Sequence, residues 1–120
     1  MFDIEPYRIN QKIMWDTALQ IQKDFGKYDL EIHFAGETYF AYSELYQQLC
    51  MQLANLVACD FGRVMSLLYQ IDVDENAFSE AEKNFPDFQK HEIMAELIIR
   101  REMQKVVTRM YFSQQNSNKQ

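Results

Sequence analysis

One segment of the chain, residues 88–112, constrains the fold more than any other, because it is long and contains no glycine or proline. In its first half, apolar side chains cover nearly the whole circumference of a helix, namely Ile93, Met94, Leu97, Ile98 and Ile99. Its second half keeps a narrower apolar stripe of Met103, Val106 and Met110. We therefore expect a long last helix whose first half lies at the centre of the core.

Apolar residues at helical spacing predict three shorter helices before the last one. The first covers residues 7–25, and Gly26 is suited to end it because glycine accepts the left-handed conformation at a helix end. Ser43 would cap the second helix, and Asp60 would break that helix and cap a short third one. The chain is thus expected to be mainly α, a compact bundle of about four helices.

Between the first two predicted helices the pattern changes from helical to alternating. Tyr28, Leu30, Ile32 and Phe34 alternate with polar residues, which is typical of a strand with one buried face. Ala35-Gly36 would form the loop of a hairpin, and residues 37–42 its second arm. The sequence therefore predicts a short β-hairpin between the first and second helices, packed on the bundle.

The length of 120 residues suits one domain, which we place at residues 1–112. Residues 113–120 contain no apolar side chain and are expected to form a disordered tail.

No apolar run is long enough to span a membrane, and the first residues lack the pattern of a signal peptide. Nine residues of helix, about 13 Å, separate Cys50 from Cys59, which disfavours a disulfide. A cytoplasmic protein is expected.

Three short motifs copy part of a catalytic or metal-binding sequence, but each lacks the partners that its chemistry requires. Residues 60–62 spell the metal-binding Asp-Phe-Gly of protein kinases, without a glycine-rich loop or a His-Arg-Asp sequence. Residues 72–76 copy three calcium-ligand positions, but Lys83 stands where a bidentate glutamate is needed. His91 begins a zinc-protease-like pattern whose second histidine is replaced by Ala95. We expect no metal, no cofactor and no catalytic residue, so the sequence favours a non-enzyme.

Charge is distributed unevenly along the chain, whose net charge is −6. Residues 88–112 carry five bases and three acids, whereas residues 1–87 carry six bases and fifteen acids. On the last helix, Arg101, Lys105 and Arg109 recur every four residues and would form a basic stripe. This stripe is a candidate surface for a protein partner or a small anion. Alternatively, these bases stabilise the helix dipole and pair with acids of the same fold.

Aromatic residues are concentrated between positions 28 and 46. Tyr42 and Tyr46 would lie one helical turn apart, with Tyr39 close by in the predicted hairpin. These three tyrosines are candidates for an interface or an apolar ligand pocket. The alternative is that they pack the hairpin onto the helices.

Two stretches, residues 67–73 (LLYQIDV) and residues 99–109 (IRREMQKVVTR), resemble a group of small uncharacterised bacterial cytoplasmic proteins. The resemblance covers roughly the C-terminal half of the chain. It implies a bacterial source and a small helical protein, and it brings no activity, ligand or site residue.

Two classes of function remain. The first is a non-catalytic protein-interaction module that binds a protein partner or forms a homodimer. The second is a small-ligand or anion-binding domain, which includes an enzyme whose site assembles only in three dimensions. Nucleic acid is disfavoured because the acidic body would repel phosphates at long range.

Overall fold

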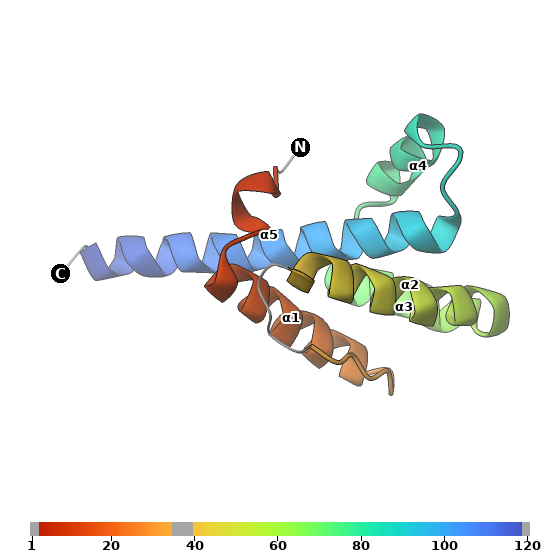
Figure 1. The fold of residues 1–120 in the computed structure, drawn as a ribbon, viewed down its shortest axis with the longest axis horizontal. Helices are drawn as coiled ribbons and strands as arrows, with labels where there is room; N and C mark the ends of the chain where they lie inside the picture. Colours follow the sequence, from red (N-terminus) through yellow and green to blue (C-terminus); the bar gives the residue numbers. More distant parts are fainter. Residues whose placement is uncertain (1–2, 35–39, 119–120) are drawn as a thin grey trace.

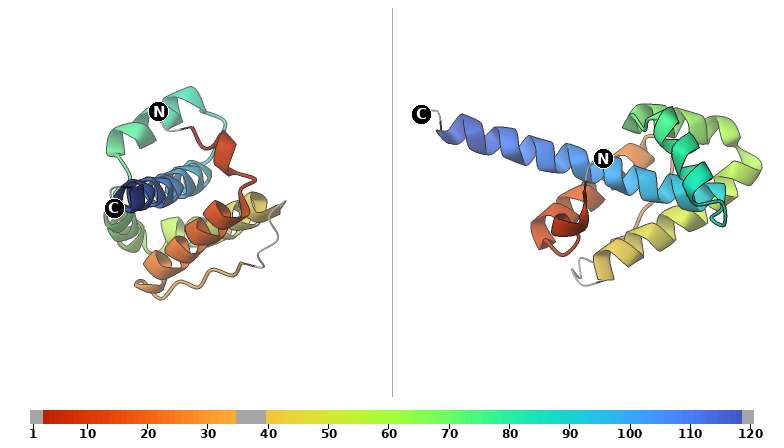
Figure 2. Two further views of the ribbon diagram at one scale, coloured as in Figure 1. Left: turned by 90° about the vertical axis from the view of Figure 1, so that its left-hand side faces the viewer. Right: turned by 90° about the horizontal axis from the view of Figure 1, so that it is seen from above.

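The structure of the protein is a computed structural model, which describes residues 3–34 and 40–118 and shows an all-helical fold (Figure 1). A short 3-10 turn, η1 (Glu5–Tyr7), precedes α1 (Gln11–Gly26) and α2 (Ala41–Cys59). The chain continues through α3 (Phe61–Ile71), α4 (Glu75–Asn84) and α5 (Lys90–Asn118). Helices α1, α2 and α3 lie on one side of α5, and η1 and α4 lie on the other (Figures 1 and 2).

The first half of α5 is the centre of the fold, as its nearly all-round apolar pattern predicts. Viewed along its axis, α5 is surrounded by the other elements (Figure 2, left). Ile98 and Ile99 have no exposed surface. They share one core with fully buried side chains of α1 and α2, among them Met14, Ile21, Leu45, Leu49 and Leu53. Helix α5 has its most extensive contacts with α2 and α1, and burial of its apolar side chains there stabilises the fold.

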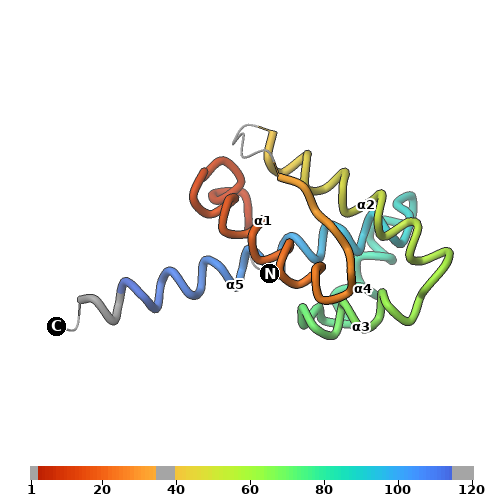
Figure 3. The backbone as a smooth tube through the Cα atoms, turned by 90° about the horizontal axis from the view of Figure 1, so that it is seen from below, coloured from red at the N-terminus to blue at the C-terminus, as the bar shows by residue number. Residues whose placement is uncertain are grey.

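The predicted β-hairpin is wrong. No strand is present in residues 3–34 or 40–118, and Ala41 and Tyr42, which should belong to the second arm, already lie in α2. The proposed loop and the rest of that arm, residues 35–39, lie outside the described residues. Residues 27–34 instead run as a connection between α1 and α2 (Figure 3).

Glutamine side chains replace the missing partner strand. The Gln22 Nε2 donates to the carbonyl of Ile32 at 2.8 Å. The backbone N–H of His33 donates to Gln48 Oε1 at 2.7 Å, and Gln48 Nε2 donates to the carbonyl of the same residue. Gln52 Nε2 donates to the carbonyl of Glu31. Four backbone polar groups of residues 31–33 are thus satisfied without a sheet, while Ile32 is still buried in the core.

Helix boundaries follow side-chain caps. Asn10 Oδ1 accepts from the N–H of Ile13 at 3.0 Å, so α1 begins after Asn10 rather than at residue 7. Asp60 caps α3 as predicted, with its Oδ1 3.1 Å from the N–H of Arg63. Ser43, the predicted cap of the second helix, lies inside α2, which begins at Ala41.

The C-terminal part of α5 projects from the body of the molecule (Figures 1 and 2). A helix of 29 residues is about 43 Å long, and the whole chain measures 51 Å along its longest axis. The helix continues past the expected end at residue 112 to Asn118, so residues 113–118 of the expected tail are helical. All described side chains from Tyr111 to Gln114 are exposed.

Candidate functional site

A cavity of about 370 Å³ lies between α4 and α5, next to α2. Helix α4 presents the small side chains of Ala77 and Ala81 to it, and α5 presents Ile93 and Leu97. Because alanine is short, α4 leaves room above the apolar face of α5. No residue of α4 is fully buried, which agrees with a helix that covers α5 across a hollow.

Aromatic side chains from two segments complete the apolar wall. Phe85 and Phe88, in the connection between α4 and α5, line the cavity and contact each other edge-to-face with ring centroids 5.9 Å apart. Tyr46 of α2 lines it as well. The two phenylalanines are each about half exposed, at 54% and 52%, which is unusual for side chains of this size.

The polar lining of the cavity is mainly acidic. It comprises the carboxylates of Glu80, Glu92 and Glu96, the amide of Asn84 and the guanidinium of Arg100. Arg100 Nε donates to Glu96 Oε1 at 3.0 Å, so these two charges neutralise each other. Glu92 Oε1 accepts from the N–H of Gln89 at the start of α5, an uncharged group that does not offset the charge of the carboxylate. The cavity therefore has an excess of negative charge.

A hydrogen-bonded group behind the cavity fixes the Glu96–Arg100 pair. The Tyr42 hydroxyl donates to Glu96 Oε2, and the guanidinium of Arg8 lies 4.1 Å from the centre of the Tyr42 ring. Burial, followed by the hydrogen bond to Glu96, raises the pKa of Tyr42 above its ordinary value. Tyr42 therefore stays a neutral phenol that donates its proton to Glu96.

Tyr46 and Cys50 lie one turn apart on α2, and the phenol and the thiol both have raised pKa values. Burial raises the pKa of Tyr46, and the hydrogen bond between its hydroxyl and Cys50 raises it further. Burial likewise raises the pKa of the Cys50 thiol, an effect that Glu92 and Glu96 increase. A neutral phenol and a neutral thiol at physiological pH are suited to packing and hydrogen bonding rather than to nucleophilic attack.

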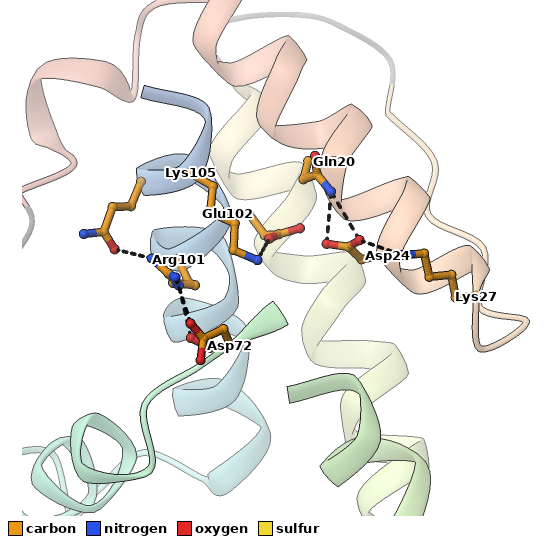
Figure 4. Close-up of polar contacts among 8 residues, drawn as sticks. Gln20, Asp24, Lys27, Asp72, Arg101, Glu102 and Lys105 are labelled. Atoms are coloured by element: carbon orange, nitrogen blue, oxygen red, sulfur yellow. Dashed lines mark hydrogen bonds and ion pairs between the residues drawn. The ribbon is translucent and has the colours of Figure 1, made fainter. Parts of the chain in front are cut away.

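The three residues of the predicted basic stripe have different surroundings in the structure, and Figure 4 shows two of them, Arg101 and Lys105. Arg101 binds Asp72 at the end of α3, with 3.0 Å between its Nη2 and the carboxylate Oδ2 and 3.1 Å between its Nε and the carbonyl. Lys105 Nζ donates to the buried carboxyl group of Glu102 at 3.0 Å. Arg109 is exposed and lines a smaller hollow of about 270 Å³ between α1 and α5. Two of the three cations are thus paired within the fold.

The three candidate tyrosines have different places in the structure. Tyr46 lines the cavity, and Tyr42 acts behind it through Glu96. Tyr39 lies outside the described residues. Sequence reasoning missed Phe85 and Phe88, although two phenylalanines around Pro86, outside any apolar stripe, were a visible signal of exposed aromatic surface.

Sequence reasoning also missed a pair of buried carboxyl groups between α1 and α5. Asp24 is 3% exposed and Glu102 is 0% exposed, and Glu102 points toward Asp24 (Figure 4). Burial and the hydrogen bond with Asp24 raise the pKa of Glu102 to about 8, against a smaller opposing effect of Lys105. The signal was present, because Glu102 interrupts the apolar stripe that runs through Ile98 and Val106.

Replacing Arg101 with glutamine is expected to lower the free energy of unfolding by about 1 kcal/mol. The change removes the ion pair with Asp72 and the hydrogen bond to its carbonyl, where the backbone has a positive φ of 67°. Thermal or urea unfolding measures the loss. Arg109→Gln is the matched control and should cost less than about 0.5 kcal/mol, because Arg109 is exposed. Equal losses in both variants would contradict a structural role for Arg101.

These observations define the class of protein as an all-α domain with one long central helix and an acid-lined apolar cavity. Within the described part of the chain, no three His, Cys, Asp or Glu side chains are grouped so that they could hold a metal ion. None of the helices described in residues 3–34 and 40–118 is long and apolar enough to cross a membrane. A comparison with known protein families, curated proteins and solved structures finds no match.

Proposed function

We propose that the protein is a non-catalytic interaction module that associates with a second copy of itself through the end of α5. One observation carries the proposal: α5 leaves the body of the molecule (Figure 3), and Tyr111 and Phe112 in its last turns are each 60% exposed. A short stretch of helix without tertiary contacts is only marginally stable in water, and aromatic side chains are enriched at protein interfaces. A partner that packs on this end would stabilise the helix and bury both rings.

Charge complementarity supports a second copy as the partner. Residues 88–112 carry more bases than acids, whereas residues 1–87 carry fifteen acids and six bases. Arg109 is exposed near the projecting end. Because Arg100, Arg101 and Lys105 already have acidic partners in the same chain, it is Arg109 of one copy that is attracted to the acidic body of another, and a two-fold axis makes the contact reciprocal.

Apolar surface next to the projecting end adds to this argument. Leu19 of α1 is 47% exposed and lines the hollow between α1 and α5 together with Val106 and Met110 of α5. Trp15, one turn earlier on α1, is 45% exposed. Large apolar side chains exposed on two neighbouring helices are typical of a surface that becomes buried on association.

Wild-type protein is expected to form a dimer at micromolar concentration, and the double variant Tyr111→Ser, Phe112→Ser is expected to be monomeric while it retains the helical circular dichroism of the folded protein. The two rings contribute little to the isolated fold because they are exposed. Size-exclusion chromatography with light scattering measures the mass. A control variant, Met51→Ser with Tyr69→Ser, changes side chains that are 74% and 90% exposed on α2 and α3 and should stay dimeric. A monomeric wild type would overturn the proposal.

A cytoplasmic location is part of the same proposal. Cys50 and Cys59 are both free, and Cys59 is exposed. An exposed free thiol is typical of a reducing compartment. The resemblance to bacterial cytoplasmic proteins in residues 67–73 and 99–109 agrees with this location.

The alternative function, a small-ligand-binding domain, has a specific observation in its favour. The cavity between α4 and α5 has the size of a ligand site and is lined by aromatic and charged side chains. An anion at the basic stripe is less favoured, since Arg101 already pairs with Asp72 and Lys105 already donates a hydrogen bond to Glu102.

A further inference from the structure

We propose that the cavity between α4 and α5 binds a small organic cation, namely an ammonium group attached to an apolar body. The proposal goes beyond self-association, because the cavity is lined by α2, α4, α5 and the connection between α4 and α5, and not by the projecting end of α5. Its three supports are the volume of the cavity, the sign of its charge and the placement of its aromatic rings.

The volume and the walls select the apolar body of the ligand. Ligand sites in proteins measure roughly 300–1,000 Å³, so about 370 Å³ accommodates a single ring with a short substituent. Ala77 and Ala81 on one side and Ile93 and Leu97 on the other offer no hydrogen bonds from their side chains. A ligand that enters this space must therefore be mostly apolar.

The charge selects a cation. Three carboxylates line the cavity with one guanidinium, and that guanidinium is paired with Glu96. Glu80 is exposed on α4, and Glu92 lies on α5, so the two remaining carboxylates come from opposite walls. An anion entering here would be repelled, whereas a cation between Glu80 and Glu92 would be attracted from both sides. The net charge of −6 of the whole chain acts in the same direction.

The aromatic rings favour an alkylated ammonium over a metal ion. Phe85, Phe88 and Tyr46 line the same cavity, and the face of an aromatic ring attracts a cation within about 6 Å of its centre. Quaternary ammonium groups are bound in this way because they combine positive charge with an apolar surface. A metal ion would require oxygen or nitrogen ligands in place of these rings.

Benzyltrimethylammonium is the probe that tests the proposal, because it combines one ring with a quaternary ammonium. Titration calorimetry, or the shift of the protein's amide resonances, should show saturable binding to the wild type. Neopentylbenzene has the same shape without the charge and should bind at least about tenfold more weakly, since it lacks the attraction of the carboxylates and rings. Phenylacetate, which carries a negative charge, should not bind. Equal affinity for the cation and its neutral isostere would overturn the proposal.

Two double variants test whether benzyltrimethylammonium binds in this cavity. The double variant Glu80→Gln, Glu92→Gln should weaken binding about tenfold, since it removes both unneutralised carboxylates while the amide oxygen introduced at position 92 can still accept from the N–H of Gln89. The control Asp29→Asn, Glu31→Gln makes the same change in net charge at two exposed positions outside the lining and should leave the affinity unchanged. The same loss in both double variants would show a general charge effect and would overturn the site.

A cavity-filling variant tests the site without altering its charge. Ala81→Leu places a larger side chain in the cavity and should abolish binding while the helical circular dichroism is retained. Ala58→Leu makes the same change at an exposed position of α2 and should bind the probe as the wild type does. Undiminished binding to Ala81→Leu would overturn the assignment of this cavity.

Discussion

Replacing Ile98 with alanine should lower the free energy of unfolding by about 2–5 kcal/mol. Ile98 has no exposed surface and lies in the half of α5 that packs against both α1 and α2. Its loss leaves a cavity at the centre of the core, because the surrounding helices relax only partly. Urea unfolding followed by circular dichroism measures the loss.

The control for Ile98 is Ile9→Ala, which removes the same atoms from a side chain that is 77% exposed. This variant should change the free energy of unfolding by less than about 0.5 kcal/mol. If Ile98→Ala costs as little as Ile9→Ala, then α5 is peripheral and the hydrophobic centre lies elsewhere in the fold.

The central position of α5 could be predicted because its apolar pattern is local and long. The large apolar residues between Ile93 and Ile99 leave almost no polar face, and that pattern permits a core position whatever surrounds the helix. The same holds for Asp60, whose cap on α3 depends on the N–H of Arg63, three residues away. Both features depend on neighbours in the sequence, and both were predicted correctly.

The predicted hairpin is wrong because the hydrogen-bond partners of this segment are distant in the sequence. Alternation of Leu30, Ile32 and Phe34 with polar residues indicates a segment with one buried face, and that part of the interpretation describes the structure well. It does not indicate what satisfies the backbone. The partners are glutamine side chains 10, 15 and 21 residues distant, and no short-range pattern distinguishes them from glutamines that face solvent.

The candidate sites were only partly predictable for the same reason. The spacing of Arg101, Lys105 and Arg109 places them along one helix, but the partner of Arg101 lies 29 residues earlier in the chain. The cavity is built from α2, α4, α5 and the connection between α4 and α5. Its size therefore depends on how these segments pack, which spacing within one helix does not reveal. Tyr46 could be proposed from its aromatic neighbourhood, whereas the joint placement of Glu80 and Glu92 could not.

The buried pair Asp24 and Glu102 makes stability depend on pH in a direction that is opposite to that of a carboxylate whose pKa is lowered by an ion pair. Burial and the hydrogen bond with Asp24 raise the pKa of Glu102 from 4.5 to about 8 in the folded state. Protonated Glu102 can donate to Asp24, whereas the ionised form would leave its buried Oε2 without a hydrogen bond. The charged groups facing this site are Asp24 and Lys105, and Lys27 lies 3.9 Å from Asp24.

Between about pH 4.5 and 8 the unfolded chain loses the proton of Glu102 while the folded protein keeps it. The contribution of Glu102 to stability is therefore fully present below pH 4.5 and is lost as the pH rises through about 8. Each unit of pKa corresponds to about 1.4 kcal/mol, so the loss amounts to a few kcal/mol. Glu102→Gln replaces the protonated acid by a neutral amide that can still donate to Asp24 and accept from Lys105.

Glu102→Gln should therefore be more stable than the wild type above pH 8 and should lose this advantage as the pH falls toward 4.5, where the wild-type side chain is protonated in the folded state. Urea unfolding at a series of pH values measures the difference. Glu31→Gln is the control, because Glu31 is exposed and its change should give a nearly constant difference over the same range. A wild type that gains stability relative to Glu102→Gln as the pH rises would show that the carboxylate is ionised in the fold and held by Lys105. Glu102 and Lys105 would then form a salt bridge on α5 that faces Asp24. The dependence of stability on pH would have the opposite sign.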